Sequence, residues 1–204
     1  MQVINEAAPF AFDAESEALI PPILAKYPAD RAASAVIPLL YVAQKQAGRT
    51  TGNAWLSRAT MDCVAQRLGM APIRVYEVAT FYFMFNTKPI GRFHLQVCTT
   101  TPCWLRGSDE VVAACKRVTG IAQFGGTSAD GLFTMTEVEC LGACVNAPIL
   151  QIDDDFYEDV DGEITERLLG MIKRGEKLPN PGSMIGRHTS APVGGPTTLL
   201  AGVE

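Results

Sequence analysis

The spacing of hydrophobic and polar residues is helical through roughly the first eighty-five positions of the chain. Acidic and apolar positions over residues 15–28 indicate a short amphipathic helix. Ala, Ile, Leu and Val recur at helical spacing over residues 31–48. We expect this second helix to kink or break at Pro38, since proline lacks the backbone N–H, and to end at Gly48.

Two further helices are marked by residues that commonly begin or end a helix. Ser57 is suited to cap a helix over residues 58–68, with Gly69 closing it. Pro72 is suited to the first turn of a helix over residues 72–85, whose end is the aromatic run FYFMF. We interpret that run as core at a helix end, with a partner-facing patch as the alternative. These elements together predict a small N-terminal helical bundle.

The pattern changes after the Pro/Gly turn TKPIGR. Alternating apolar positions then indicate strands, and two amphipathic stretches indicate helices. In order, we expect a strand over 93–98, a helix N-capped by Ser108 that ends before Gly120, a strand over 132–140, two strands within 149–160 joined by an acidic turn, and a helix over 164–176. This order fits an α/β fold of the α+β kind, with helices packed on a small mixed sheet.

The last part of the chain loses its periodicity after Leu178 and is rich in Pro, Gly, Ser and Thr. Such a segment is disordered by itself, so we expect it to lie along a partner. The predicted organisation is therefore a helical bundle over 1–88, a sheet domain over 89–178 and an extended tail over 179–204.

Composition narrows the class of protein. The net charge of −5 and pI of about 5.1 give no basic surface for nucleic acid or an anionic membrane. No apolar run reaches the eighteen or more residues of a membrane span, and we expect no signal or transit peptide at the acidic N-terminus. Six cysteines in 204 residues are too sparse for a disulfide scaffold, and in a reducing compartment clustered cysteines more often bind metal or do redox chemistry.

Four of the six cysteines form two pairs, each just past the end of a predicted strand. Cys98 and Cys103 enclose TTTP, and Cys140 and Cys144, which enclose LGA, follow after thirty-six intervening residues. If the two strands are parallel neighbours, their ends emerge at one edge of the sheet, where α/β folds commonly place sites. The four thiols would then converge in one pocket.

Four converging thiolates suit either zinc or an iron–sulfur cluster. Structural zinc sites usually use tighter C-x2-C spacing, so the wider loops favour a two-iron cluster. Gly142 and Ala143 allow the backbone to approach bridging sulfides, and Thr99, Thr100 and Thr101 offer hydroxyl and amide donors that would stabilise the reduced state. Zinc stays open as the alternative.

The remaining chemistry-bearing residues have plainer interpretations. Cys115 shares a helix face with apolar residues and is expected to be a buried small hydrophobe, and Cys63 is similar. His94 and His188 stand alone, which favours structural or solvent-facing roles over metal binding. The acidic run over 153–159 lacks EF-hand spacing and indicates a hairpin turn. We find no catalytic triad, paired catalytic carboxylates or nucleotide fingerprint, and expect no catalytic residue in this chain.

The motifs CTTTPC, DGLFTMTEVECLGACVNAP and FYEDVDGEITERLL, together with EVATFYFMFNTKPIGRFHLQVC, resemble the thioredoxin-like 2Fe–2S subunit of the NADH dehydrogenase module of respiratory complex I. The resemblance covers residues 15–178, and the tail resembles the C-terminal extension of some members. It implies a thioredoxin-like domain after the helical bundle, and one 2Fe–2S cluster bound by Cys98, Cys103, Cys140 and Cys144. It also implies a cis peptide bond before Pro148.

The resemblance further implies a subunit of an H⁺-translocating NADH:quinone reductase that carries electrons and does not itself bind the substrate. Its partners would be the FMN- and NADH-binding subunit and other complex I subunits, with no nucleic acid and no membrane span of its own. The expected location is peripheral, on the cytoplasmic side of a bacterial inner membrane or on the matrix side in mitochondria. The alternatives are the equivalent subunit of a soluble NAD-dependent formate dehydrogenase or bidirectional hydrogenase, and, more remotely, a zinc-binding interaction domain.

Overall fold

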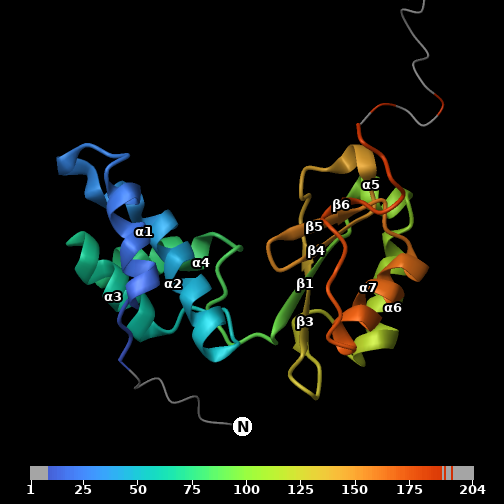
Figure 1. Cartoon of the computed structure of the whole chain (residues 1–204), viewed down its shortest axis with the longest axis horizontal. Helices are drawn as coiled ribbons and strands as arrows, with labels where there is room; N and C mark the ends of the chain where they lie inside the picture. Colours follow the sequence, from blue (N-terminus) through green and yellow to red (C-terminus); the bar gives the residue numbers. More distant parts are fainter. Residues whose placement is uncertain (1–8, 190, 192–193, 195–204) are drawn as a thin grey trace, which may run out of the picture. The chain divides into compact units, whose positions relative to one another are not determined.

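A computed structural model of the protein describes residues 9–189, 191 and 194, and the chain folds into two compact units (Figure 1). The first, Met1–Arg92, is called the helical unit below, and the second, Phe93–Glu204, the sheet unit. Among the described residues, no helix combines the length and the apolar character needed to cross a bilayer.

The helical unit has its own apolar core, which includes Ile20, Leu40, Val64 and Val75. Its elements are α1 (Ala14–Leu24), the 3₁₀ helix η1 (Ala29–Ala35), α2 (Val36–Thr51), α3 (Arg58–Leu68) and α4 (Pro72–Phe81).

Three predicted helix boundaries in the helical unit are confirmed. The Ser57 side chain caps α3 by accepting from the Thr60 N–H at 3.1 Å, and Gly69 ends that helix in the left-handed conformation. Pro72 begins α4, where its missing N–H would have no helical partner in any case.

The predicted end of α2 at Gly48 and the break at Pro38 are wrong. The helix continues to Thr51 and is closed by Gly52, which has φ 73°. Gly48 instead permits close packing, because a Cβ there would lie 3.0 Å from the Ala54 Cβ. Pro38 falls in the first turn of α2, where the lost donor costs nothing, and the irregular backbone lies earlier, at Arg31.

The aromatic run after α4 is exposed over most of its length. Helix α4 ends at Phe81 rather than Phe85. Phe85, the last residue of the run, is buried in the core, whereas Phe81, the first, is not. Phe81 and Phe83 are 78% and 66% exposed, so the interpretation of this run as core is wrong for its first part.

The sheet unit contains a six-stranded sheet in the order β2-β3-β1-β4-β5-β6. Strand β1 is parallel to β3 and antiparallel to β4, so the predicted mixed sheet and α/β class are confirmed. The elements are β1 (Phe93–Cys98), α5 (Thr101–Leu105), α6 (Ser108–Thr119), β2 (Gly126–Thr127), β3 (Phe133–Val138), the 3₁₀ turn η2 (Cys144–Asn146), β4 (Ile149–Ile152), β5 (Asp155–Glu158), α7 (Gly162–Lys173) and β6 (Gly182–Ser183).

Alternation along the strands sends one set of side chains towards α6 and α7, which lie together on one side of the sheet (Figure 1). Leu95, Val97, Phe133, Met135 and Leu150 join residues of both helices in the main core. The opposite side chains of β1, which include Cys98, therefore lie on the other face of the sheet.

The start of α6 differs from the expectation. Gly107, with φ 97°, takes the cap position, and Ser108 is the first helical residue, with a buried Oγ that makes no hydrogen bond. The predicted end at Gly120 is confirmed.

Short elements that periodicity cannot reveal are α5, β2 and β6. Strand β6 pairs in parallel with β5, Gly182 lying beside Tyr157. The first part of the Pro/Gly-rich tail therefore lies on its own sheet unit and does not need a partner there. Residues 190, 192–193 and 195–204, the rest of the tail apart from residues 191 and 194, lie outside the described residues.

His94 is buried in a hydrogen-bonded arrangement with the acidic turn between β4 and β5, which forms the hairpin predicted there. The backbone N–H of His94 donates to Asp153 Oδ1 at 2.8 Å, and the backbone N–H of Asp153 donates to the His94 carbonyl at 2.9 Å. The His94 ring Nε2 lies 2.8 Å from Thr136 Oγ1. Burial lowers the pKa of His94 to about 4 and raises the pKa of Asp153 to about 6. The structural role expected for this histidine is confirmed.

A dependence of stability on pH follows for His94. Its folded pKa lies below the usual 6.5, so the unfolded chain binds the extra proton first and stability falls as pH drops from about 6.5 to about 4. The loss is at most about 3 kcal/mol. Asp153, with its raised pKa, acts in the opposite direction between pH 3.8 and about 6.

We expect His94→Gln to remove the pH dependence of stability that comes from His94 and to leave the pH dependence that comes from Asp153. The difference in free energy of unfolding between the native chain and the variant, measured with urea at pH 4 to 7.5, should shrink as pH falls. A difference that is constant over this range would contradict the prediction.

Candidate functional site: four thiols at one edge of the sheet

The two cysteine pairs lie at the same edge of the sheet because β1 and β3 are parallel and in register. Cys98 is the last residue of β1 and is paired with Val138, the last residue of β3. Cys103 follows within α5, and Cys140 and Cys144 flank the loop after β3. The chain thus brings together all four cysteines singled out from the sequence.

Cys98 and Cys103 form the buried half of the site. Each is 1% exposed, and they pack with Ala147 and Ile149 in a small apolar cluster. Burial by itself raises the pKa of Cys98. Hydrogen bonding from the Thr100 hydroxyl, which lies 3.2 Å from Sγ, and from the Leu141 N–H outweighs this effect, so the pKa of Cys98 is lowered.

The other thiols differ in their preferred protonation. Burial, followed by the neighbouring Cys98 thiol, raises the pKa of Cys103 to about 12. Cys140 is exposed and Cys144 half-buried, with their sulfurs 3.1 Å apart. The contact with Cys144 and the Gly142 N–H lower the pKa of Cys140, whereas the Cys140 thiolate raises the pKa of Cys144.

The site therefore consists of two thiol pairs, and in each pair one thiol has a lowered pKa and the other a raised pKa. In the part of the chain that the structure describes, no three ligating side chains already converge as a single-ion site. A structural zinc ion would need all four thiolates in one tetrahedron, whereas a two-iron cluster is held by four thiolates, two for each iron. The donor set and its division into pairs fit a 2Fe–2S cluster better than zinc.

The loops that carry the thiols are shaped by particular backbone requirements. Gly142 has φ 88°, a left-handed conformation that favours glycine, and a Cβ there would meet nothing within 4 Å. The need for glycine is therefore conformational. The peptide bond before Pro148 is cis, as the resemblance implies.

Of the threonines expected to face the site, Thr100 is confirmed by its contact with Cys98. The Thr99 hydroxyl instead donates to Glu137 Oε1 at 2.5 Å, so the expectation that this hydroxyl faces the thiols is wrong. Residue type alone could not separate these neighbours, because their directions depend on the turn into α5.

The residues left out of the site lie elsewhere. Cys115 is fully buried in the main core, where burial raises its pKa to about 12, and Cys63 is half-buried in α3. His188 is exposed. The interpretation of Cys115 as a small hydrophobe is confirmed.

Exposed apolar side chains beside the thiols were not singled out from the sequence. Trp104 and Leu105, directly after Cys103, are largely exposed, and so is Val145, directly after Cys144. Their position in the sequence, directly after cysteines of the two pairs, is the feature from which they could have been identified.

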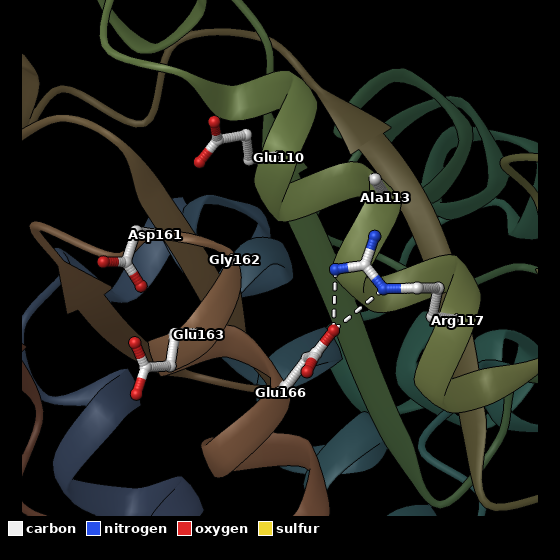
Figure 2. Close-up of a pocket in the computed structure, with 7 residues that line it drawn as sticks. All are labelled: Glu110, Ala113, Arg117, Asp161, Gly162, Glu163 and Glu166. Carbon is white, nitrogen blue, oxygen red and sulfur yellow. Dashed lines mark hydrogen bonds and ion pairs between the residues drawn. The ribbon is translucent and has the colours of Figure 1, made fainter.

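A cavity of about 490 Å³ lies between α6 and the start of α7, away from the cysteines. Its lining is mostly acidic and includes Glu110, Asp161 and Glu163 (Figure 2). Arg117 is paired with Glu166 at 2.6 Å. The cavity lining contains no cysteine, so it is separate from the thiol site.

Replacing Gly142 by Val should lower the iron and sulfide bound per chain. A β-branched residue at φ 88° is strained by about 1–2 kcal/mol, so the loop would shift and misplace Cys140 and Cys144. Asn, which tolerates the left-handed region better, should retain more iron than Val. Iron and acid-labile sulfide analysis of purified protein measures both.

Gly120→Val is the matched control, since Gly120 has φ 72°, open space around it and no contact with the thiols. It should lower thermal stability without lowering iron content. Equal iron content in Gly142→Val and the native chain would contradict the role of the left-handed turn.

Comparisons with known proteins agree with this geometry. The family described as thioredoxin-like [2Fe-2S] ferredoxin matches residues 20–173. The chain is 50% identical over 196 residues, 96% of its length and 76% of the relative, to mitochondrial NADH dehydrogenase [ubiquinone] flavoprotein 2 of Dictyostelium discoideum. It is 49% identical over 160 residues, 78% of its length and 91% of the relative, to a subunit of the NADH-quinone oxidoreductase of Rickettsia typhi.

Among solved structures, the chain resembles an NAD⁺-reducing [NiFe]-hydrogenase in the H₂-reduced state, with a TM-score of 0.56 and 20% identity. The match covers 70% of this chain but only 23% of the hydrogenase chain, and it shows a shared fold. With four paired thiols at one edge of a mixed sheet and a family match over most of its length, this chain belongs to the thioredoxin-like [2Fe–2S] ferredoxin family, whose cofactor is one 2Fe–2S cluster.

Proposed function

We propose that this chain is the electron-transfer subunit of an NADH:quinone oxidoreductase, and that Cys98, Cys103, Cys140 and Cys144 bind its single 2Fe–2S cluster. The observation that carries the proposal is the gathering of these four thiols as two pairs at the shared end of β1 and β3. The names of the relatives that are about half identical support the host enzyme.

The cluster, when bound, supplies a one-electron acceptor and donor, and the protein supports it in two ways. The apolar surroundings of Cys98 and Cys103 exclude water from one side. The Thr100 hydroxyl lies 3.2 Å from Cys98 Sγ, and the Leu141 and Gly142 N–H groups favour the thiolate forms of Cys98 and Cys140. Hydrogen-bond donors in these positions would stabilise the added negative charge of the reduced state.

The proposed partner is the FMN- and NADH-binding subunit, together with other subunits of the same enzyme. Electron exchange requires that subunit to approach the cluster, and Trp104, Leu105 and Val145 present exposed apolar surface beside the thiols. Aromatic and aliphatic side chains in such positions commonly anchor protein interfaces. In the complex, the chain would be a peripheral subunit that does not itself span the membrane.

The second candidate is the equivalent subunit of a soluble NAD-dependent formate dehydrogenase or bidirectional hydrogenase. The fold that this chain shares with part of an NAD⁺-reducing hydrogenase supports this second candidate. Isolation of the native complex distinguishes the two candidates, because only the respiratory enzyme brings membrane-embedded subunits with it.

Replacing any one of Cys98, Cys103, Cys140 or Cys144 by Ala should reduce bound iron and sulfide severely, whereas Cys115→Ala should retain them. Cys115 is fully buried in the main core, so this control also reveals iron loss caused by destabilisation alone. Electron paramagnetic resonance after dithionite reduction, with iron, sulfide and zinc quantified on the same samples, provides the measurement. A native chain that contains zinc and no sulfide would overturn the proposal.

Leu105→Glu should weaken binding of the flavin-bearing subunit about 30-fold or more, because a charge would be buried in an apolar contact. Its cluster signal should remain, since Leu105 is not a thiol ligand. Ile73→Glu, at an exposed apolar position of α4 in the helical unit, is the matched control. Titration of purified partner subunit against each variant gives the affinities, and equal affinities would contradict docking at this surface.

A further inference from the structure

The segment after α7 returns to the sheet unit and runs beside β5. Glu158 is paired with Ser183, and the Met184 N–H donates to the Glu158 carbonyl at 2.9 Å. We call residues 182–187 the C-terminal strap. The strap lies beyond residues 20–173, the part of the chain that the family match covers.

The strap is attached through a nearly buried ion pair. Arg187 Nη1 lies 3.3 Å from Asp159 Oδ1, and their side chains are only 18% and 5% exposed. Ser183 Oγ donates to Asp159 Oδ2 at 2.6 Å and accepts from the Arg187 N–H at 3.2 Å. Asp159 therefore accepts from two residues of the strap.

The same group of residues is attached to the chain that follows Cys144. The Asp159 N–H donates to the Asn146 carbonyl at 2.7 Å, and Arg187 Nη1 makes a longer contact of 3.4 Å with the Val145 carbonyl. The Asn146 side chain adds a bond of 2.7 Å to Glu158 Oε2. Movement of the turn Cys144–Asn146 would break these contacts.

An ion pair at the surface contributes little to stability, and a buried one costs desolvation of both charges. The pair of Arg187 and Asp159 is well shielded, and it contacts the backbone one and two residues after a thiol of the site. Charges and hydrogen bonds in such a position influence both the geometry and the reduction potential of a metal cluster.

We propose that Arg187 is a positioning residue for the cluster site, acting through Asp159 and the turn after Cys144. It holds this turn closed, and its positive charge compensates the Asp159 carboxylate near the site. The inference rests on the proposed function, since it takes Cys144 as a cluster ligand.

The test uses the full chain with Arg187→Met, which keeps an apolar stem and removes the charge. Arg174→Met is the matched control, because Arg174 is exposed and its ion pair is with Glu176, two residues further along the chain. Loss of the cluster to an iron chelator should be about tenfold faster in Arg187→Met, the change expected when hydrogen bonds to a charged group are lost. Its midpoint potential should also fall, because an uncompensated carboxylate disfavours the extra electron.

Two further variants separate the tether from the charge. Arg187→Lys keeps the charge but replaces the planar guanidinium, whose Nη1 contacts both Asp159 and Val145 and whose Nη2 donates to the Ala191 carbonyl, by a flexible ammonium. The potential should therefore stay near native while the cluster is lost faster. Asp159→Asn with Arg187→Met removes both charges, so the potential should return towards the native value. If Arg187→Met does not fold, the comparison of Arg187→Lys with the native chain still tests the tether, because faster loss of the cluster supports it and an unchanged rate contradicts it.

Amide hydrogen exchange of the cluster-free chain gives a readout independent of the cluster. Amides of residues 143–147 should exchange faster in Arg187→Met than in Arg174→Met. A native chain that binds no cluster overturns the proposed function. A native chain that binds one, with chelation, potential and exchange in Arg187→Met equal to the control, overturns only the inference about Arg187.

Discussion

The parallel pairing of β1 with β3 is the constraint on which the site depends. It places Cys98 beside Val138, so the segments that carry both thiol pairs leave the sheet at one edge. Side chains alternate between the faces of a strand, and a shift of one residue in register would move Cys98 into the face that packs against α6 and α7. The apolar residues on that face, such as Leu95, Val97 and Met135, prevent this shift because they would lose their burial. The core thus sets the geometry of the thiols without touching a metal.

The site is a compromise between shielding and solvation. Cys98 and Cys103 are buried, which by itself disfavours thiolates, and the protein offsets this cost at Cys98 with donors from Thr100 and Leu141. Cys140 and Cys144 remain closer to water on a loop whose turn requires Gly142. One side of the site is consequently shielded from water, while the other is exposed. This asymmetry suits a centre that must be protected and also exchange electrons.

A few polar contacts near the thiols add the C-terminal strap to the sheet unit. The sheet is completed at one edge by the two-residue strand β6, and Arg187 and Ser183 hold Asp159 beside the turn after Cys144. A segment with the composition of a disordered tail thereby becomes ordered where specific polar partners are available. In the helical unit the reverse occurs, because the aromatic residues Phe81 and Phe83 remain exposed after α4 ends. Composition predicts neither outcome, since both depend on which neighbours the fold provides.

The sequence by itself determined the class of fold, the order of the longer helices and strands, and the four cysteines that gather, because these follow from local periodicity, caps and spacing. Ser57, Gly69 and Gly120 act as helix boundaries through contacts within a few residues, so they could be predicted. Only the tertiary structure decided that Gly48 packs against Ala54 while Gly52 ends α2, and that Gly107 rather than Ser108 caps α6. It also decided that Thr100 faces the thiols while Thr99 turns to Glu137, and that the strap joins the sheet. The physical reason is that the glycine and cap positions depend on how the chain turns and packs in space, which local periodicity does not specify. The Thr99 contact and the strap depend in addition on residues far apart in the chain, which meet only when the sheet has formed.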